Sequence, residues 1–596
     1  MALSAGTRPV LGPDLRRRAA RAPRVASRRP GYQRRVAWLL VGSLLVVGVI
    51  WSRLVYWQVI EHQRLSADAL GQYSKVVQLP AARGLIYDRN GQPLAINETV
   101  YSVVAAPNQV PSTEREHVAA ALSAATGRPL AAVESILASG AQFAYIARQQ
   151  PKAVADKLGA ENLAGVGLEP ETRRTYLPGG TPDSTLASNL LGFVNDAGAG
   201  QYGVEAFYQS QLAGKNGSMS TYQDLTGRQI VIGAENRHDP VNGSDLQLTI
   251  DADIQHSAEQ ALAAGVALNK AESGSVIVMD PQTGAIIAWA DYPTYNANSF
   301  GSTPVDRFID PIASYLYEPG STMKVVTLSG AIENKAITPT STFYDPGHIS
   351  VGGVTLYDWD RANHGTINYT TVLEDSLNVG AVTALNLEGA NAYYRNLVNF
   401  GFASPSGIDV AAESAVPLKA EADYRPSEMA TTSYGQGISV NMVQMVAAVN
   451  VVANGGRYVQ PHVVDRVGGR PTSLSLQAPR QVISPSTAAQ MNQMMKAVVQ
   501  KGSGSMARIA GFQNDEAGKT GTSQIPVNGQ YTQDVWSSYV GYMPASNPRF
   551  TMLVVVRKPH NANWIANDGY IVAAPIWQQI AQAIVLDWHI APTPGT

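Results

Sequence analysis

The chain has 596 residues, which is too long for one compact core, so several domains are expected. Its formal net charge of −2 hides an asymmetry: residues 1–35 hold ten arginines against one acid, Asp14, a net +9 that leaves −11 for the remainder. A basic tail ahead of an acidic body argues against a protein that binds nucleic acid along its length. The absence of cysteine excludes a disulfide framework, a thiolate metal site and a cysteine nucleophile.

An apolar segment follows the basic tail. Residues 36–51, VAWLLVGSLLVVGVIW, contain no charge, and a helix continued to Ile60 would be about 37 Å long, enough for a hydrocarbon core of about 30 Å. The arginines place the N-terminus in the cytoplasm, and Arg53 would lie near the outer interface. We therefore expect a basic cytoplasmic tail (1–35), a transmembrane signal anchor (36–60) and an extracytoplasmic remainder. A cleaved signal peptide, with ADA at residues 67–69 as its cleavage site, is the alternative, but its apolar region is usually shorter.

Residues 61–242 mix short strand-like and helix-like runs. ARGLIYDRNGQPLA reads as two strands joined by a turn at Asn90-Gly91, and HVAAALSAATGRPLAAVESILA as helices broken near Gly127. Residues 235–245, ENRHDPVNGSD, are polar and rich in turn formers, and they mark the expected boundary between a domain at 61–242 and one at 243–596.

The second domain begins and ends with strands. DLQLTI is followed by a helix capped by Asp251 or Asp253, then by a hairpin of SGSVIVMD and GAIIAWAD. Near the C-terminus come two more strands, SSYVGYMP and RFTMLVVVRK, and a closing helix, APIWQQIAQAIVLDWH. Residues from 321 to about 510 read as helical. The order predicts an α+β fold with an antiparallel sheet and a helical insert.

The stretch AGKTGTSQ, residues 517–524, has two incompatible interpretations. A phosphate-binding P-loop ends in Gly-Lys-Thr but requires a glycine at position 513, which is Gln513 here. Lys-Thr-Gly is instead one wall of the site in enzymes that acylate a serine. The spacing excludes the P-loop and favours an acyl-transfer site containing Lys519.

A nucleophile and its base lie upstream, in YEPGSTMK. Of the twelve lysines only Lys324 has a serine three residues before it, Ser321. On one face of a helix beginning after Pro319-Gly320, the Ser321 Oγ and Lys324 Nζ atoms can meet. A lysine buried near another cation loses proton affinity and can act as the base, and free N–H groups at a helix start suit an oxyanion.

Two Ser-x-Asn triplets lie between these motifs. Ser376-Leu377-Asn378 reads as a loop between helices that could present a hydroxyl and an amide to a cleft. Ser439-Val440-Asn441 could be a loop or a turn that supports the site. We favour the triplet of Ser376 and Asn378.

Together, YEPGSTMK, SLN, SYGQGISVN and GKTGTSQ resemble the class B penicillin-binding proteins, which are membrane-anchored serine D,D-transpeptidases of peptidoglycan. RGLIYDRNGQPLA is similar to the start of their pedestal domain, and GVEAFYQSQLAGKNG and LTIDADIQ to later segments, so the resemblance covers nearly all of the chain. The middle residue of the second motif, Leu377, is one that the family varies. The resemblance implies a pedestal related to the family's dimerisation domain, followed by a penicillin-binding, serine β-lactamase-like transpeptidase domain.

The resemblance also implies the roles of the site residues. Ser321 attacks the penultimate D-Ala carbonyl of a stem peptide and Lys324 takes its proton, while Ser376 and Asn378 relay protons and hold the peptide. Lys519, Thr520 and Thr522 bind the terminal carboxylate, and they lie on one strand together with Gly521. The backbone of this strand near Thr522 completes an oxyanion hole with the Ser321 N–H. No metal, cofactor or nucleic acid is implied, and β-lactams are expected as covalent inhibitors.

Three other functions share parts of this pattern. A β-lactamase would need a water-activating Glu-x-x-x-Asn loop, which is absent between Asn378 and Lys519. A membrane antibiotic sensor needs a larger cytoplasmic part or more spans, and a bifunctional synthase needs a glycosyltransferase domain that residues 66–242 do not suggest. Within the family the motifs resemble the cell-division branch more than the elongation branch. We expect a glycosyltransferase partner and other division proteins, with Gly42, Ser43 and Gly48 allowing close helix contact in the membrane.

Overall fold

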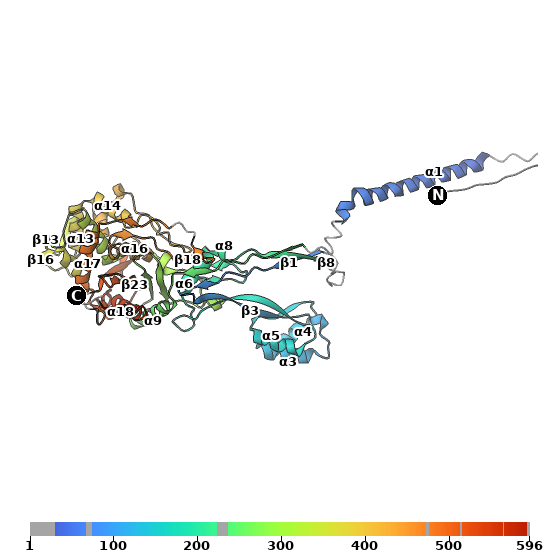
Figure 1. Ribbon diagram of the computed structural model, residues 1–596, viewed down its shortest axis with the longest axis horizontal. Helices are drawn as coiled ribbons and strands as arrows, with labels where there is room; N and C mark the ends of the chain where they lie inside the picture. Colours follow the sequence, from blue (N-terminus) through green and yellow to red (C-terminus); the bar gives the residue numbers. More distant parts are fainter. Residues whose placement is uncertain are drawn as a thin grey trace, which may run out of the picture. The chain divides into compact units, whose positions relative to one another are not determined.

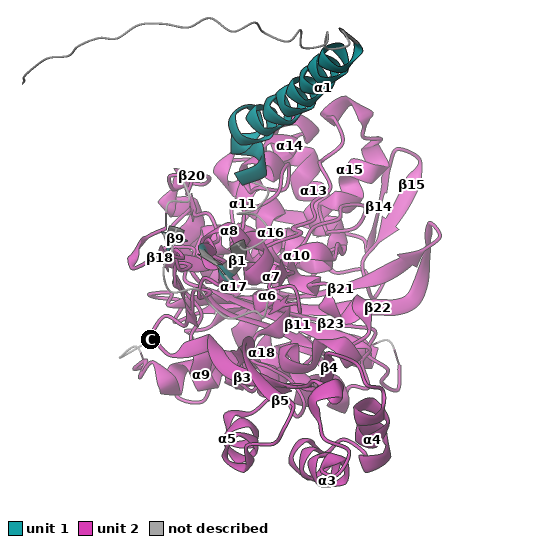
Figure 2. Ribbon diagram, turned by 90° about the vertical axis from the view of Figure 1, so that its right-hand side faces the viewer, with its two compact units in different colours: residues 1–78, 218–238 teal, residues 79–217, 239–596 magenta. Residues whose placement is uncertain are grey.

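The computed structural model describes residues 30–66, 74–222, 236–472, 476–512, 515–563 and 565–592. The arginines before residue 30, the alternative cleavage site at residues 67–69 and Gln513 lie outside these ranges. The chain divides into two compact units, one of residues 1–78 with 218–238 and one of residues 79–217 with 239–596 (Figure 2).

The first unit contains the predicted anchor. Helix α1 (Pro30–Val55) continues into a π-helical turn at Tyr56–Ile60, and Gly31–Ile60 is the one helix in the described ranges long and apolar enough to cross a membrane. Its apolar side chains are exposed, as lipid contact would require. The Arg53 guanidinium lies 5.3 Å from the Trp57 ring centroid, which suits a cation at an interface. Strands β1 (Ser74–Leu79), β8 (Gly217–Tyr222) and β9 (Asn236–His238) form a separate small sheet.

The N-terminal part of the second unit is built on a long strand. β2 (Ile86–Tyr87) and β3 (Pro93–Ala105) pair antiparallel across the predicted turn, where Gly91 has a φ of 84°. β3 also pairs with β4 (Ala144–Gln150) and β5 (Val166–Tyr176). Helices α3 (Arg115–Thr126), α4 (Leu130–Ala138) and α5 (Lys152–Glu161) pack beside β3 around a separate apolar core (Figure 1). Both the hairpin and the helix break at Gly127 are confirmed.

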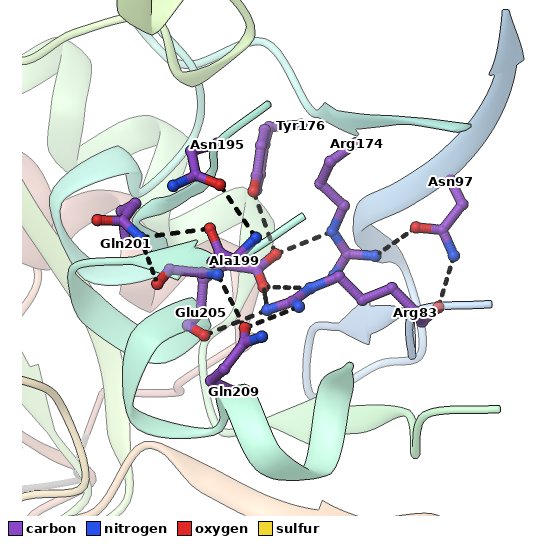
Figure 3. A network of polar contacts seen from close by, with 10 residues as sticks. Arg83, Asn97, Arg174, Tyr176, Asn195, Ala199, Gln201, Glu205 and Gln209 are labelled. Carbon is purple, nitrogen blue, oxygen red and sulfur yellow. Dashed lines mark hydrogen bonds and ion pairs between the residues drawn. The ribbon is translucent and has the colours of Figure 1, made fainter. Parts of the chain in front are cut away.

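A buried ion-pair network joins this sheet to α7 (Gly203–Phe207), as Figure 3 shows. The Glu205 carboxylate accepts hydrogen bonds from Arg83 Nε and Arg174 Nε, each at 2.8 Å, and from the Tyr176 hydroxyl at 3.1 Å. Glu205 is fully buried and Arg174 nearly so. Breaking such a pair leaves an uncompensated buried charge, at a cost of about 3–5 kcal/mol. The network therefore fixes α7 to β5 and to the segment that precedes β2.

One sheet crosses the expected boundary near residue 242. β10 (Leu246–Leu248) pairs parallel with β2 and antiparallel with β18 (Val464–Val467), which belongs to the insert. The Tyr208 hydroxyl also donates to Asp409 Oδ2 at 2.8 Å, and Asp409 accepts the Val463 and Val464 N–H groups. The two segments are therefore one compact unit, and a division at residue 242 stays a prediction.

The C-terminal part contains the predicted antiparallel sheet, which has five strands. Its order is β12 (Ile286–Tyr292), β11 (Ser273–Met279), β23 (Phe550–Arg557), β22 (Gln530–Met543) and β21 (Ala517–Val527). Alternate residues of β23 face opposite cores: Val554 packs with α9 (Ala252–Leu268) and α18 (Ala573–Asp587), whereas Leu553 packs with the insert. Asp251 is the N-cap of α9, and the predicted hairpin, later strands and closing helix are confirmed.

The insert is less helical than predicted. It follows the short helix α10 (Pro311–Ser314), and its helices are α11 (Lys324–Glu333), α12 (Tyr369–Glu374), α13 (Asn378–Glu388), α14 (Ala390–Asn399), α15 (Pro426–Thr432), α16 (Met442–Ala453) and α17 (Pro485–Gln500). Between α11 and α12 lie two antiparallel pairs, β13 (Thr342–Asp345) with β16 (Gly365–Asn368) and β14 (His348–Val351) with β15 (Val354–Tyr357). The prediction of helix was wrong there because Gly352 and Gly353 adopt positive φ values that turn the chain into a hairpin.

Candidate active site

Ser321 lies in a tight turn that leads into α11. Gly320–Met323 form a 3₁₀ turn, so the α-helix begins at Lys324, a few residues later than the predicted start after Pro319-Gly320. Gly320 has a φ of 58°, and a Cβ there would lie 2.8 Å from the Thr522 carbonyl oxygen of β21. Only glycine fits both constraints, and the turn thereby holds Ser321 against the sheet edge.

Lys324 connects Ser321 to the favoured second motif. Its Nζ lies in hydrogen-bond contact with Ser321 Oγ at 3.0 Å, and it donates to the Ser376 carbonyl at 2.5 Å and to Asn378 Oδ1 at 2.8 Å. The side chain is fully buried. The spacing prediction that Ser321 and Lys324 can meet therefore agrees with the geometry.

The loop before α13 presents the second motif. Ser376 has a φ of 61°, a strained value for a residue with a side chain and one that is common at functional sites. Asp358 caps α13 by accepting the N–H groups of Asn378 at 2.5 Å and Val379 at 2.9 Å. The loop is thereby held with Ser376 and Asn378 toward Lys324.

The other triplet is placed differently. Asn441 is fully buried and caps α16, accepting the Gln444 N–H at 2.8 Å and donating to the Ser414 carbonyl at 2.8 Å. Its side-chain and backbone contacts with Gln444, Glu413 and Ser414 are those of a helix cap.

Strand β21 carries the third motif. Lys519 is fully buried, and its Nζ donates to Ser376 Oγ at 2.9 Å. The Thr520 hydroxyl donates to Ser503 Oγ at 3.1 Å. A Cβ on Gly521 would lie 2.9 Å from the Pro319 carbonyl, so glycine allows the strand to approach the Ser321 turn. Because Gly518-Lys519-Thr520 lies within a strand, the rejection of a P-loop is confirmed.

The two buried lysines lose proton affinity. Burial, with a smaller contribution from the charge of Lys519, holds the pKa of Lys324 well below its usual range, against the opposing charge of Asp358. Burial lowers the pKa of Lys519 to about 7, against the charges of Asp568 and Asp375. A neutral Lys324 beside the Ser321 hydroxyl is a suitable general base.

A cleft of about 740 Å³ opens onto these groups. It is lined by all three motifs and by further residues: Ser321, Trp359, Asp360, His364, Glu374, Asp375, Ser376, Asn378, Tyr434, Gln436, Lys501, Gly502, Ser503, Thr520, Thr522, Gln524, Gln533, Val535 and Asp568. Sequence reasoning missed Asp358, Ser503 and Asp568. No local pattern marks them, because each reaches the site through contacts between segments distant in the chain.

A serine at the start of a helix, a buried lysine beside it and a lysine-bearing edge strand across a cleft define a class of protein, the serine acyl-transfer enzymes on an α+β scaffold. Two family models match the chain: the penicillin binding protein transpeptidase domain over residues 274–582 and the penicillin-binding protein dimerisation domain over residues 78–248. The chain belongs to the class B penicillin-binding proteins and is a transpeptidase of that family.

Relatives agree over almost the whole chain. This chain is 30% identical to stage V sporulation protein D of Bacillus subtilis, in an alignment that covers 94% of this chain and 86% of that protein. It is 28% identical to peptidoglycan D,D-transpeptidase FtsI of Escherichia coli, covering 94% and 93%. The crystal structure of penicillin binding protein 3 from Mycobacterium tuberculosis, complexed with aztreonam, superposes with a TM-score of 0.66 at 26% identity over 87% of this chain and 98% of that one.

Proposed function

We propose that this transpeptidase cross-links the stem peptides of peptidoglycan through an acyl-enzyme on Ser321. Ser321 Oγ bonds to the carbonyl carbon of the penultimate D-Ala, and the bond to the terminal D-Ala breaks. An amine of a neighbouring stem peptide then attacks the ester and restores the Ser321 hydroxyl. The observation that carries this proposal is the position of Lys324 Nζ, hydrogen-bonded at once to Ser321, Ser376 and Asn378.

Each motif has one task in this scheme. Neutral Lys324 takes the Ser321 proton, and Ser376 passes a proton toward the leaving amine, supported by its contact with Lys519. Asn378 holds Lys324 and the peptide. Cationic Lys519 binds the terminal carboxylate together with Thr520 and Thr522, which lie on either side of Gly521 in β21. The backbone N–H groups of Ser321 and Thr522 stabilise the oxyanion.

The same nucleophile explains inhibition. A β-lactam that places its strained amide over Ser321 and its carboxylate near Lys519 would acylate the enzyme, and the stable ester would block the cleft. The aztreonam complex of the similar penicillin binding protein 3 from Mycobacterium tuberculosis supports the proposal that β-lactams bind in this cleft.

We further propose a membrane-anchored role in septal wall synthesis beside a glycosyltransferase. Helix α1 anchors the chain with its N-terminus in the cytoplasm, residues 61–242 form the pedestal and residues 243–596 the transpeptidase domain. The resemblance of YEPGSTMK and SYGQGISVN to the cell-division branch of the family supports a septal role. Depletion should give filamentous cells, whereas round cells would assign the chain to elongation.

The test is reconstitution of the full chain in detergent with lipid-linked disaccharide-pentapeptide. Alone, it should make no glycan strands, and with a competent polymerase it should cross-link them. Ser321→Ala should abolish cross-links, while Ser439→Ala, which changes the serine of the other triplet, should retain them. Cross-linking by Ser321→Ala would overturn the proposed mechanism, and glycan polymerisation by the chain alone would overturn the monofunctional assignment.

A further inference from the structure

The Thr522 hydroxyl is already engaged in the free enzyme. Its Oγ1 donates to Asp568 Oδ1 at 2.7 Å and accepts the Gly569 N–H at 3.2 Å. A hydroxyl has one hydrogen to donate. The Thr522 hydroxyl, which is proposed to bind the substrate carboxylate, therefore already donates its only hydrogen to the Asp568 carboxylate.

The backbone that carries Asp568 is fixed against the sheet. A Cβ on Gly569 would lie 2.6 Å from the Gly521 carbonyl oxygen and 2.3 Å from that of Ser538, so this segment lies directly on β21 and β22. The Asp568 N–H donates to the Ile565 carbonyl at 3.1 Å. Because this backbone is held, the Asp568 carboxylate would leave Thr522 by side-chain rotation, which also breaks the hydrogen bond that Asp568 Oδ1 accepts from the Tyr570 N–H at 3.3 Å. The carboxylate is half-buried and lines the cleft.

Two carboxylates cannot share the one Thr522 hydrogen. We propose that Asp568 is a specificity-determining positioning residue, which occupies the Thr522 hydroxyl in the free enzyme and must release it when a carboxylate-bearing donor binds. This inference rests on the proposed function, in which Thr522 and Lys519 receive the terminal carboxylate. Ligands without a carboxylate do not require the release, so Asp568 lowers the preference of the cleft for anionic ligands.

Asp568 also has an opposing influence through Lys519. Its negative charge raises the pKa of Lys519, as does that of Asp375, against the lowering by burial. Removing Asp568 therefore makes Lys519 lose its proton at lower pH, which weakens carboxylate binding near neutrality. The comparison is therefore made at pH 5.5, below the parent Lys519 pKa of about 7, where the loss of Asp568 deprotonates this lysine less than it does near neutrality and the competition for Thr522 remains.

The test measures the second-order rate constants for acylation by benzylpenicillin and by its methyl ester at pH 5.5, with the detergent-solubilised full chain. The ratio of the acid to the ester rate constants cancels changes that affect both ligands. Asp568→Asn keeps the side-chain shape and an acceptor oxygen but removes the charge. It should raise the ratio about five- to tenfold, the scale of one charge-assisted contact in a partly exposed cleft.

Asp375→Asn is the matched control, because Asp375 also raises the Lys519 pKa and lines the cleft, whereas the Thr522 hydroxyl is bound by Asp568 and Gly569. It should leave the ratio at pH 5.5 unchanged, and Asp568→Glu, which restores the charge, should return it toward the parent value. An unchanged or lower ratio in Asp568→Asn, or an equal rise in Asp375→Asn, would overturn the inference. Failure of the parent to be acylated by either ligand would instead contradict the proposed function.

Discussion

At the scale of single residues, two buried lysines share one hydrogen-bond network but must differ in protonation state. Lys324 must be neutral to accept the Ser321 proton, whereas Lys519 must be cationic to bind a carboxylate. Both contact Ser376, and each has a pKa lowered mainly by burial. The charge of Asp358 raises the pKa of Lys324, and the charges of Asp568 and Asp375 raise that of Lys519. These neighbouring carboxylates therefore limit how far burial lowers each pKa.

This arrangement predicts a pH profile that depends on the ligand. Acylation by benzylpenicillin should rise with pH as Lys324 loses its proton, and should fall above about pH 7, where Lys519 loses the charge that binds the carboxylate. The methyl ester should show the same rise without the fall. Stopped-flow acylation rates from pH 5 to 9 would check this, and an equal alkaline fall for both ligands would remove the assigned role of Lys519.

At the scale of secondary-structure elements, the site depends on the contact between β21 and the Ser321 turn. Gly521→Ala should weaken this contact between β21 and the turn, because the new Cβ would lie 2.4 Å from Ser538 Oγ and 2.9 Å from the Pro319 carbonyl oxygen. We expect acylation to slow about 100-fold and the free energy of unfolding to fall by about 1–3 kcal/mol.

Gly301→Ala is the matched control for this prediction, since nothing lies within 4 Å of a Cβ there. It should change neither acylation rate nor thermal midpoint. Acylation of Gly521→Ala within about twofold of the parent would show that the close approach is not required; a twofold change is about 0.4 kcal/mol.

Local patterns predicted much of this architecture. Apolar runs identified the strands of the main sheet. The three-residue spacing predicted that Ser321 and Lys324 meet, and their Oγ and Nζ atoms lie 3.0 Å apart. The short pairs β13–β16 and β14–β15 were missed because only two of their sixteen residues, Asp345 and Leu356, are buried, which leaves little apolar pattern to read. Asp358 and Asp568 were missed because their partners lie 20 and 46 residues away, and a single sequence carries no record of such contacts.

At the scale of the whole molecule, the proposed orientation separates the arginine tail from the cleft. Protease added outside spheroplasts should digest the part after Ile60 and leave a short protected fragment containing α1 and the tail. The physical reason is the excess of arginine before α1, which favours the cytoplasmic side. A soluble mature form beginning near residue 69 would indicate a cleaved signal peptide, and full protection of the large domain would reverse the orientation.

The central claim, that Ser321 forms the acyl-enzyme with Lys324 as its base, is tested most directly by intact-mass measurement after penicillin treatment, followed by peptide mapping. The account predicts one adduct on the peptide that contains Ser321, no adduct in Ser321→Ala and a much slower one in Lys324→Ala. Ser439→Ala should be acylated at the rate of the parent. An adduct that persists in Ser321→Ala, or that maps to another residue in the parent, would contradict it.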